Sequence, residues 1–249
     1  MTNPDKGRGL LRRWARFAVA AAVSAAVALG ADECAPAKQL DEILSELQKI
    51  RALLEGDGPR RGSQIHAKRA ELAVGDAPFL GSKDAPITIV EFMDYQCPYC
   101  QQFYRQTFRD LKEQYIDSRK VRFYVVQFPL ARHTNALLAA GAARCAGEQG
   151  QFWAMHGRMQ SEAGELGVDK LAGLAKEVGI DVAKFQGCIE ARKYDGAIEE
   201  GRREASSNGI RGTPTFVIGK STPTGVEGEL VTGALPFGTF EAKILALAR

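Results

Sequence analysis

The chain has 249 residues, of which 45% are apolar and 25% charged, the balance of a soluble globular protein with room for one or two domains. Its formal net charge of +3 is uneven, because residues 1–31 hold a net +4 and the rest of the chain carries −1. This charge excludes the strongly basic surface of a nucleic-acid-binding protein, and we expect no nucleic-acid partner.

Residues 1–31 predict a targeting segment. A basic stretch up to Arg16 precedes an uncharged, alanine-rich run at 17–31, and small residues at 26–30 suit a cleavage site. The apolar run is short for a membrane span, which favours a cleaved signal peptide over an uncleaved anchor, although both alternatives stay open. Either one predicts export to the periplasm and surroundings that permit disulfides, and an uncleaved anchor also predicts tethering to the inner membrane.

Residues 37–55 predict an amphipathic helix. Its apolar positions are spaced by 3, 4, 3 and 4 residues, the spacing of a coiled-coil seam: Leu40, Ile43, Leu47, Ile50 and Leu54. Because a helix this short is marginal in water alone, it needs a partner. We expect a homo-oligomer formed through residues 40–54, with packing on its own domain as the alternative. A polar linker at 56–72 then leads to the globular domain, 73–249.

The globular domain alternates between strand and helix signals. We expect strands at 87–95, 121–130, 212–219 and 228–233, helices at 101–115 and 236–248, and a mainly helical stretch between about 134 and 208. This order predicts an α/β protein with a thioredoxin-like fold and an inserted helical domain at about 131–208.

The motif Cys97-Pro98-Tyr99-Cys100 predicts a redox dithiol. It follows a strand and opens a helix, so the first sulfur lies where the helix N-terminus favours thiolate over thiol. Pro98 suits a first helical turn, which needs no N–H at that position. The alternatives are half of a zinc site and a pair of inert cysteines. Since the other cysteines and the histidines lack zinc-ligand spacing, we expect no metal and no cofactor.

Two acidic residues and one proline lie near this motif in sequence or in the expected fold. Glu91 lies on the strand before Cys97. It is either a buried acid that moves protons or a residue that faces solvent or pairs with a lysine, and the residues leave this open. Asp94 is expected to be a turn residue that caps the helix entry. Thr213-Pro214 opens the third strand, where a proline is tolerated on steric grounds alone.

Further cysteines and histidines lie in the expected helical insertion. For Cys145 and Cys188 an oxidising compartment favours a structural disulfide over two free thiols. His133 and His156 are expected to be ordinary surface histidines near helix ends.

Four segments together resemble one protein family: residues 80–100, 121–130, 142–156 and 209–219. They are similar to the DsbA-like family of exported thiol-disulfide oxidoreductases, which belongs to the thioredoxin superfamily, and in particular to its "thioredoxin 4" type domain. The resemblance implies a thioredoxin fold with inserted helices. It also assigns Cys97 as the nucleophile, Cys100 as the resolving cysteine, Thr213-Pro214 as a cis-proline loop and Glu91 as the buried acid. Some relatives carry a second, non-catalytic disulfide at positions resembling Cys145 and Cys188.

The resemblance implies a function with one departure. We expect disulfide exchange with exported proteins, and a membrane redox partner that resets the dithiol. Strongly oxidising members have histidine where this chain has Tyr99, which cannot become cationic near neutral pH, so we expect a weaker oxidant. Oxidase and isomerase or reductase directions both stay open. The alternative is a non-enzymatic oligomeric chaperone or scaffold on a thioredoxin fold.

Overall fold

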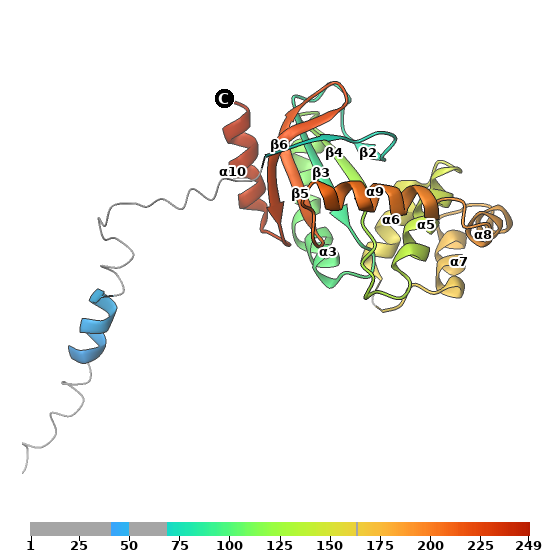
Figure 1. The fold of residues 1–249 in the computed structure, drawn as a ribbon, viewed down its shortest axis with the longest axis horizontal. Coiled ribbons are helices and arrows are strands. Elements are labelled where there is room, and N and C mark those ends of the chain that lie inside the picture. The colour runs from blue at the N-terminus through green and yellow to red at the C-terminus, as the bar shows by residue number, and fades with distance from the viewer. Residues whose placement is uncertain (1–40, 50–68, 163) are drawn as a thin grey trace, which may run out of the picture. The chain divides into compact units, whose positions relative to one another are not determined.

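The computed structural model describes residues 41–49, 69–162 and 164–249 (Figure 1). Residues 41–49 are helical and belong to a separate unit from the globular part, with Ile43, Leu44 and Leu47 exposed. The expected signal segment 1–31 lies outside the described residues, as do Leu40, Ile50 and Leu54 of the expected seam. In the described ranges no helix is both long and apolar enough to span a membrane.

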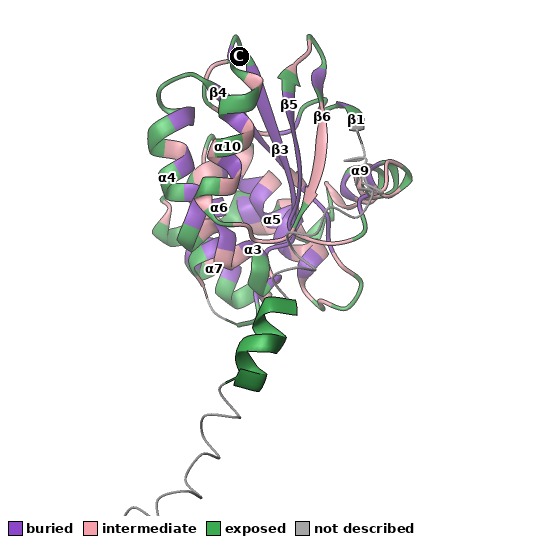
Figure 2. Cartoon of the chain, turned by 90° about the vertical axis from the view of Figure 1, so that its left-hand side faces the viewer, coloured by how far each residue is buried: buried purple, intermediate pink, exposed green. Residues whose placement is uncertain are grey.

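A six-stranded sheet with the order β1-β6-β5-β3-β4-β2 forms the centre of the globular unit. Its strands are β1 (Arg69–Ala73), β2 (Phe79–Leu80), β3 (Ile87–Met93), β4 (Val121–Gln127), β5 (Thr215–Ser221) and β6 (Gly225–Thr232). β3 and β4 pair in parallel, and every other neighbouring pair is antiparallel. All seven residues of β3 are buried, as its β-branched and apolar sequence predicts for a central strand (Figure 2).

A helix begins directly after the turn that follows β3. It runs through α3 (Pro98–Phe103), η2 (Tyr104–Phe108), α4 (Arg109–Leu111) and η3 (Lys112–Ile116), with η2 and η3 π-helical. Between β4 and β5 the described residues form five helices: α5 (Ala136–Gly147), α6 (Phe152–Ser161), α7 (Val168–Glu177), α8 (Val182–Glu190) and α9 (Asp195–Ser207). α10 (Phe237–Leu247) closes the chain. The expected helical insertion between the second and third predicted strands is therefore present.

The sheet carries a hydrophobic core on each face, because neighbouring residues of a strand point to opposite sides. On one face the ring of Phe103 in α3 lies 4.7 Å from that of Phe216 in β5 and 5.4 Å from that of Phe240 in α10. On the other face Val217 belongs to a second cluster with Ala205 of α9. Figure 2 shows α3 and α10 on one side of the sheet and α9 on the other.

Two strands and several boundaries differ from the sequence expectation. β1 lies largely within residues 56–72, the stretch expected to be a linker; it is short and its RAELA sequence carries little strand signal, yet it pairs with β6. β2 has only two residues and pairs with β4. β3 ends at Met93 rather than at residue 95, because Asp94 already belongs to the turn before Cys97.

One disulfide braces the helical insertion. It joins Cys145 in α5 to Cys188 in α8 across a sequence separation of 43 residues. This is the pair for which the sequence favoured a structural disulfide. In the chain-entropy description, closing a loop of this length stabilises the folded state by about 4 kcal/mol.

Candidate active site

The dithiol lies at the start of α3, after the turn that follows β3. Cys97 is the N-cap residue of α3, with extended backbone angles, and Pro98 is the first helical residue. Cys97 and Cys100 are unbridged in this structure and each is 0% exposed, whereas the side chain between them, Tyr99, is 60% exposed. The motif therefore presents a tyrosine to solvent and holds its two sulfurs beneath the surface.

The two sulfurs have opposite acid–base character. A hydrogen bond from Cys100, a side-chain hydrogen bond from Thr213 and backbone N–H groups of Cys100 and Tyr99 outweigh burial and lower the pKa of Cys97 to about 5. Burial, followed by the same bond to Cys97, holds the pKa of Cys100 well above its ordinary value. At neutral pH Cys97 is therefore a thiolate beside a protonated Cys100, which is the arrangement of an attacking sulfur and a reserve thiol.

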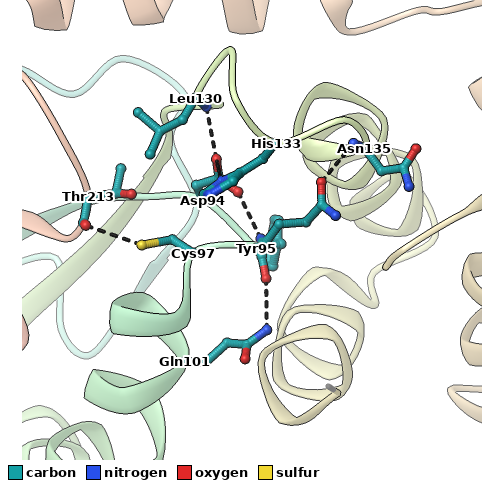
Figure 3. Close-up of polar contacts among 9 residues, drawn as sticks. Asp94, Tyr95, Cys97, Gln101, Leu130, His133, Asn135 and Thr213 are labelled. Carbon is teal, nitrogen blue, oxygen red and sulfur yellow. Dashed lines mark hydrogen bonds and ion pairs between the residues drawn. The ribbon is translucent and has the colours of Figure 1, made fainter. Parts of the chain in front are cut away.

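The loop before β5 covers the Cys97 sulfur from the other side. The Thr213–Pro214 peptide bond is cis, and as a thiol Cys97 donates to the Thr213 carbonyl at 3.2 Å (Figure 3). The Thr213 hydroxyl is buried without a partner while the sulfur is protonated, so it is available to donate once the sulfur ionises. The Pro214 carbonyl already accepts from Gly233 N at 2.8 Å. Thr213 is thus the residue of this loop whose side chain can stabilise the Cys97 thiolate by a hydrogen bond.

Glu91 is a buried acid. It is 1% exposed on β3, and its Oε1 has no hydrogen-bond partner. Burial, and to a smaller extent the nearby Cys97, raises the pKa of Glu91 to about 8. Of the two alternatives that the sequence left open, the structure shows the buried one. A carboxyl group with this pKa holds a proton at neutral pH and can exchange it as the neighbouring thiols change state.

The expectation that His156 is a surface histidine is wrong. It is 1% exposed in α6, its Nδ1 lies 3.0 Å from the Tyr95 hydroxyl, and rings of Tyr104, Phe152 and Trp153 surround it. Burial lowers the pKa of His156 to about 3, so the imidazole stays neutral. The expected position near a helix end is also wrong, because His156 lies in the middle of α6, and α6 packs against α3 and η2.

His133 is also not a free surface histidine. Its side chain is 16% exposed, and its Nδ1 lies 2.8 Å from Oδ2 of Asp94. Asp94 is a turn residue, as expected: its Oδ1 accepts from Gln96 N at 2.8 Å, and its carbonyl accepts from Cys97 N at 3.1 Å. The expectation that it caps the helix entry is wrong, because Cys97 is the N-cap residue of α3 and no side-chain hydrogen bond caps this helix. The sequence offered no signal for the His133 contact, which joins residues 39 positions apart.

Comparison with known proteins identifies the family. The sequence profile of Thioredoxin_4, described as thioredoxin, matches residues 73–226, more than half of the chain. The chain belongs to this family. The structure agrees: crystal structures of alpha-DsbA1 from Wolbachia pipientis and of a thioredoxin-like oxidoreductase from Silicibacter pomeroyi superpose with TM-scores of 0.63 and 0.58. They are 24% and 28% identical and cover 71% and 68% of this chain, and 92% and 91% of their own.

Two curated relatives carry different names. The chain is 34% identical over 139 residues to Na(+)/H(+) antiporter NhaA 1 of Salinispora arenicola, a match that covers 55% of this chain and 21% of that protein. It is 29% identical over 147 residues to probable disulfide bond formation protein D of Bacillus anthracis, a match that covers 56% of this chain and 68% of that protein. The chain thus spans about a fifth of the antiporter's length.

Replacing the buried acid is expected to stabilise the protein in a pH-dependent way. In the folded state Glu91 has a pKa of about 8, compared with 4.5 for a free side chain. Between these two values the unfolded chain loses this proton and the folded protein keeps it, so folding stability falls as the pH rises from 4.5 towards 8. Glu91→Gln removes this loss and should raise the free energy of unfolding of the reduced protein by about 3 kcal/mol at pH 7, with little gain at pH 4. Urea unfolding at the two pH values measures it. The exposed Glu200→Gln is the control, and an equal gain at both pH values for Glu91→Gln contradicts the burial account.

Proposed function

We propose that this chain is an exported thiol-disulfide oxidoreductase that exchanges disulfides with other proteins through Cys97 and Cys100. The observation that carries the proposal is the contrast between the two sulfurs, one with a pKa of about 5 and its neighbour with a raised pKa. A sulfur with this pKa is both a populated nucleophile and a good leaving group at neutral pH. The names of the Silicibacter and Bacillus anthracis relatives support the same chemistry.

As a disulfide donor, the Cys97–Cys100 disulfide accepts two electrons from a substrate dithiol. A substrate thiolate attacks the Cys97 sulfur, the intramolecular S–S bond breaks, and Cys100 leaves and takes a proton, for which Glu91 is the nearby acid. A second substrate thiolate then attacks the substrate sulfur of the mixed disulfide. The substrate disulfide forms, and Cys97 leaves as the thiolate that its surroundings stabilise.

In the reverse direction the reduced dithiol acts on a substrate disulfide. The Cys97 thiolate attacks one substrate sulfur, and the other substrate sulfur leaves. Cys100 then gives up its proton, for which Glu91 is the proposed base, and attacks Cys97 to release the reduced substrate. An isomerase uses the same first step. A different substrate thiolate then attacks the substrate sulfur of the mixed disulfide, which forms a new substrate disulfide and releases the Cys97 thiolate. Because both sulfurs are buried, oxidation and reduction of a substrate both require the loops around the turn to move apart when the substrate docks.

Export and partners complete the proposal. The signal-like residues 1–31 and the Cys145–Cys188 disulfide both suit a periplasmic location, with the segment acting as a cleaved signal or a membrane anchor. Substrates are exported proteins with thiols or disulfides, and a membrane redox partner resets the dithiol after each cycle. The exposed Ile43, Leu44 and Leu47 support self-association through residues 40–54.

Cys100→Ala is expected to trap substrates. Without the resolving thiol, the mixed disulfide at Cys97 persists, so exported proteins should accumulate as covalent adducts that dithiothreitol releases. Non-reducing electrophoresis followed by mass spectrometry detects them. The matched control is the double variant Cys97→Ala, Cys100→Ala, which should trap nothing. A non-enzymatic chaperone or scaffold would give no adducts with either variant.

Tyr99→His is expected to make the dithiol more oxidising. A histidine at position 99, within the motif, can become cationic and stabilise the Cys97 thiolate, whereas Tyr99 cannot. A lower thiol pKa in turn stabilises the reduced form. The pKa of Cys97, about 5, lies between the values of ~7 for thioredoxin and ~3.5 for DsbA, in line with an oxidant of intermediate strength. Equilibration with glutathione buffers measures both potentials. Equal potentials for the two proteins would contradict the role given to Tyr99.

Deleting residues 35–56 is expected to show whether the protein acts as an isomerase or as an oxidase. If the seam assembles several copies, light scattering should show an oligomer that becomes a monomer on deletion, because the exposed leucine and isoleucine side chains no longer pair. Refolding of a scrambled-disulfide substrate, run in parallel, tests activity. Isomerase activity lost with the segment indicates an oligomeric isomerase; a monomer that only oxidises dithiols indicates an oxidase. An unchanged mass after deletion contradicts the seam.

A further inference from the structure

The turn that carries Cys97 is attached to the segment that leads from β4 into α5. The Asp94 carboxylate, with a side chain that is 0% exposed, accepts three hydrogen bonds. Gln96 N donates from within the turn at 2.8 Å, while Leu130 N and His133 Nδ1 each lie 2.8 Å from Oδ2 (Figure 3). One oxygen therefore faces the Cys97 turn, and the other faces the start of the insertion.

Side chains on both sides of the motif also form hydrogen bonds to the insertion. Before it, the Gln96 side chain accepts from Asn135 N at 2.7 Å. After it, Gln101 Nε2 donates to the Tyr95 carbonyl at 3.1 Å and to the Glu162 carbonyl at 3.0 Å. The turn is thus bound to the insertion through three side chains that flank the two cysteines. Toward the cis-proline loop, Cys97 itself makes the contact, with Thr213.

Of these three side chains, Asp94 has the most direct effect on the position of Cys97, because it also bonds to the main chain of the turn. Its main-chain carbonyl accepts from Cys97 N at 3.1 Å and its carboxylate accepts from Gln96 N, so Asp94 sets the conformation in which the chain enters α3. A buried carboxylate is tolerated only where donors satisfy it, and here two of the three donors come from outside the turn. Loss of the outer donors would leave the carboxylate unsatisfied and the turn free to shift.

We propose that Asp94 is a positioning residue, through which Leu130 and His133 of the insertion set the geometry of Cys97 and hence its reactivity. The inference rests on the proposed function only in taking Cys97 as the attacking sulfur. The thiolate depends on short-range donors, the Cys100 thiol and the N–H groups of Tyr99 and Cys100, so a small movement of the turn weakens its stabilisation.

Asp94→Asn tests the positioning role. The amide keeps the shape of the side chain but has a single acceptor oxygen, so it can serve Gln96 N or the insertion, not both. The measurement is the pH dependence of Cys97 alkylation by iodoacetamide in the reduced protein, read by mass spectrometry. We expect the midpoint to rise by about one pH unit from about 5, which slows alkylation about fivefold at pH 5 and about tenfold well below pH 5.

The direction of the shift is decisive. Removing a nearby negative charge without moving the turn would lower the pKa of Cys97, since anions repel the thiolate. A role in stability alone would lower the melting temperature and leave the midpoint of the folded protein unchanged. A fall or an unchanged midpoint therefore overturns the inference, and a rise supports it.

Matched variants keep the test decisive if Asp94→Asn does not fold. His133→Ala removes one donor and leaves both backbone bonds, so it should raise the midpoint by less, and His133→Gln should restore part of the change by supplying an N–H. Asp181→Ala is the control: Asp181 accepts from Lys184 N at 3.1 Å at the start of α8, so its loss weakens the insertion away from the turn. An Asp181→Ala shift as large as that of His133→Ala, or no shift for His133→Ala, overturns the inference.

The readout also separates this inference from the proposed function. Alkylation reports on Cys97 without any protein substrate. If Cys100→Ala traps no exported protein while Asp94→Asn still raises the midpoint, the proposed function fails and the positioning role stands. If substrates are trapped and the midpoint does not move, the reverse holds.

Discussion

The site depends on one constraint: a negatively charged sulfur has to be held where water does not reach it. Cys97 is 0% exposed, and a buried charge is costly unless hydrogen bonds replace its hydration. The donors come from the Cys100 thiol, from the first turn of α3 and from Thr213. Burial raises the pKa of all three groups, but only at Cys97 do the donors outweigh it, so the pKa of Glu91 and that of Cys100 are raised. One environment thus gives Cys97 a lowered pKa and Cys100 and Glu91 raised ones, the contrast on which their proposed roles as nucleophile, resolving thiol and proton carrier depend.

The topology explains how these groups meet. β3 and β5 are antiparallel with Phe92 opposite Thr215, so the end of one strand and the start of the other lie at the same edge of the sheet. Cys97 follows the first, and Thr213-Pro214 precedes the second. β4 runs parallel to β3 and ends at this edge as well, so the chain enters the insertion beside the dithiol. The position of the insertion in the sequence therefore places its first residues against the Cys97 turn.

The fold does not by itself define the activity. This chain matches a fifth of a protein named as an antiporter and two thirds of one named as a disulfide bond formation protein. A shared domain can serve different proteins, so disulfide exchange is supported by the chemistry of the site rather than by the fold. The pKa contrast within the dithiol and the loop that faces Cys97 give this support. Between the two buried sulfurs of this site, the Tyr99 side chain is exposed to solvent.

The sequence alone determined the dithiol, the central strand β3, the helix that follows it and the inserted helices, because short-range spacing and periodicity carry these features. It also favoured the Cys145–Cys188 pair. Only the tertiary structure decided that Glu91 and His156 are buried, that β1 pairs with β6, and that Asp94 binds His133. Each of these depends on which distant segments pack together, and the burial and hydrogen bonding of a side chain are set by such neighbours rather than by adjacent residues.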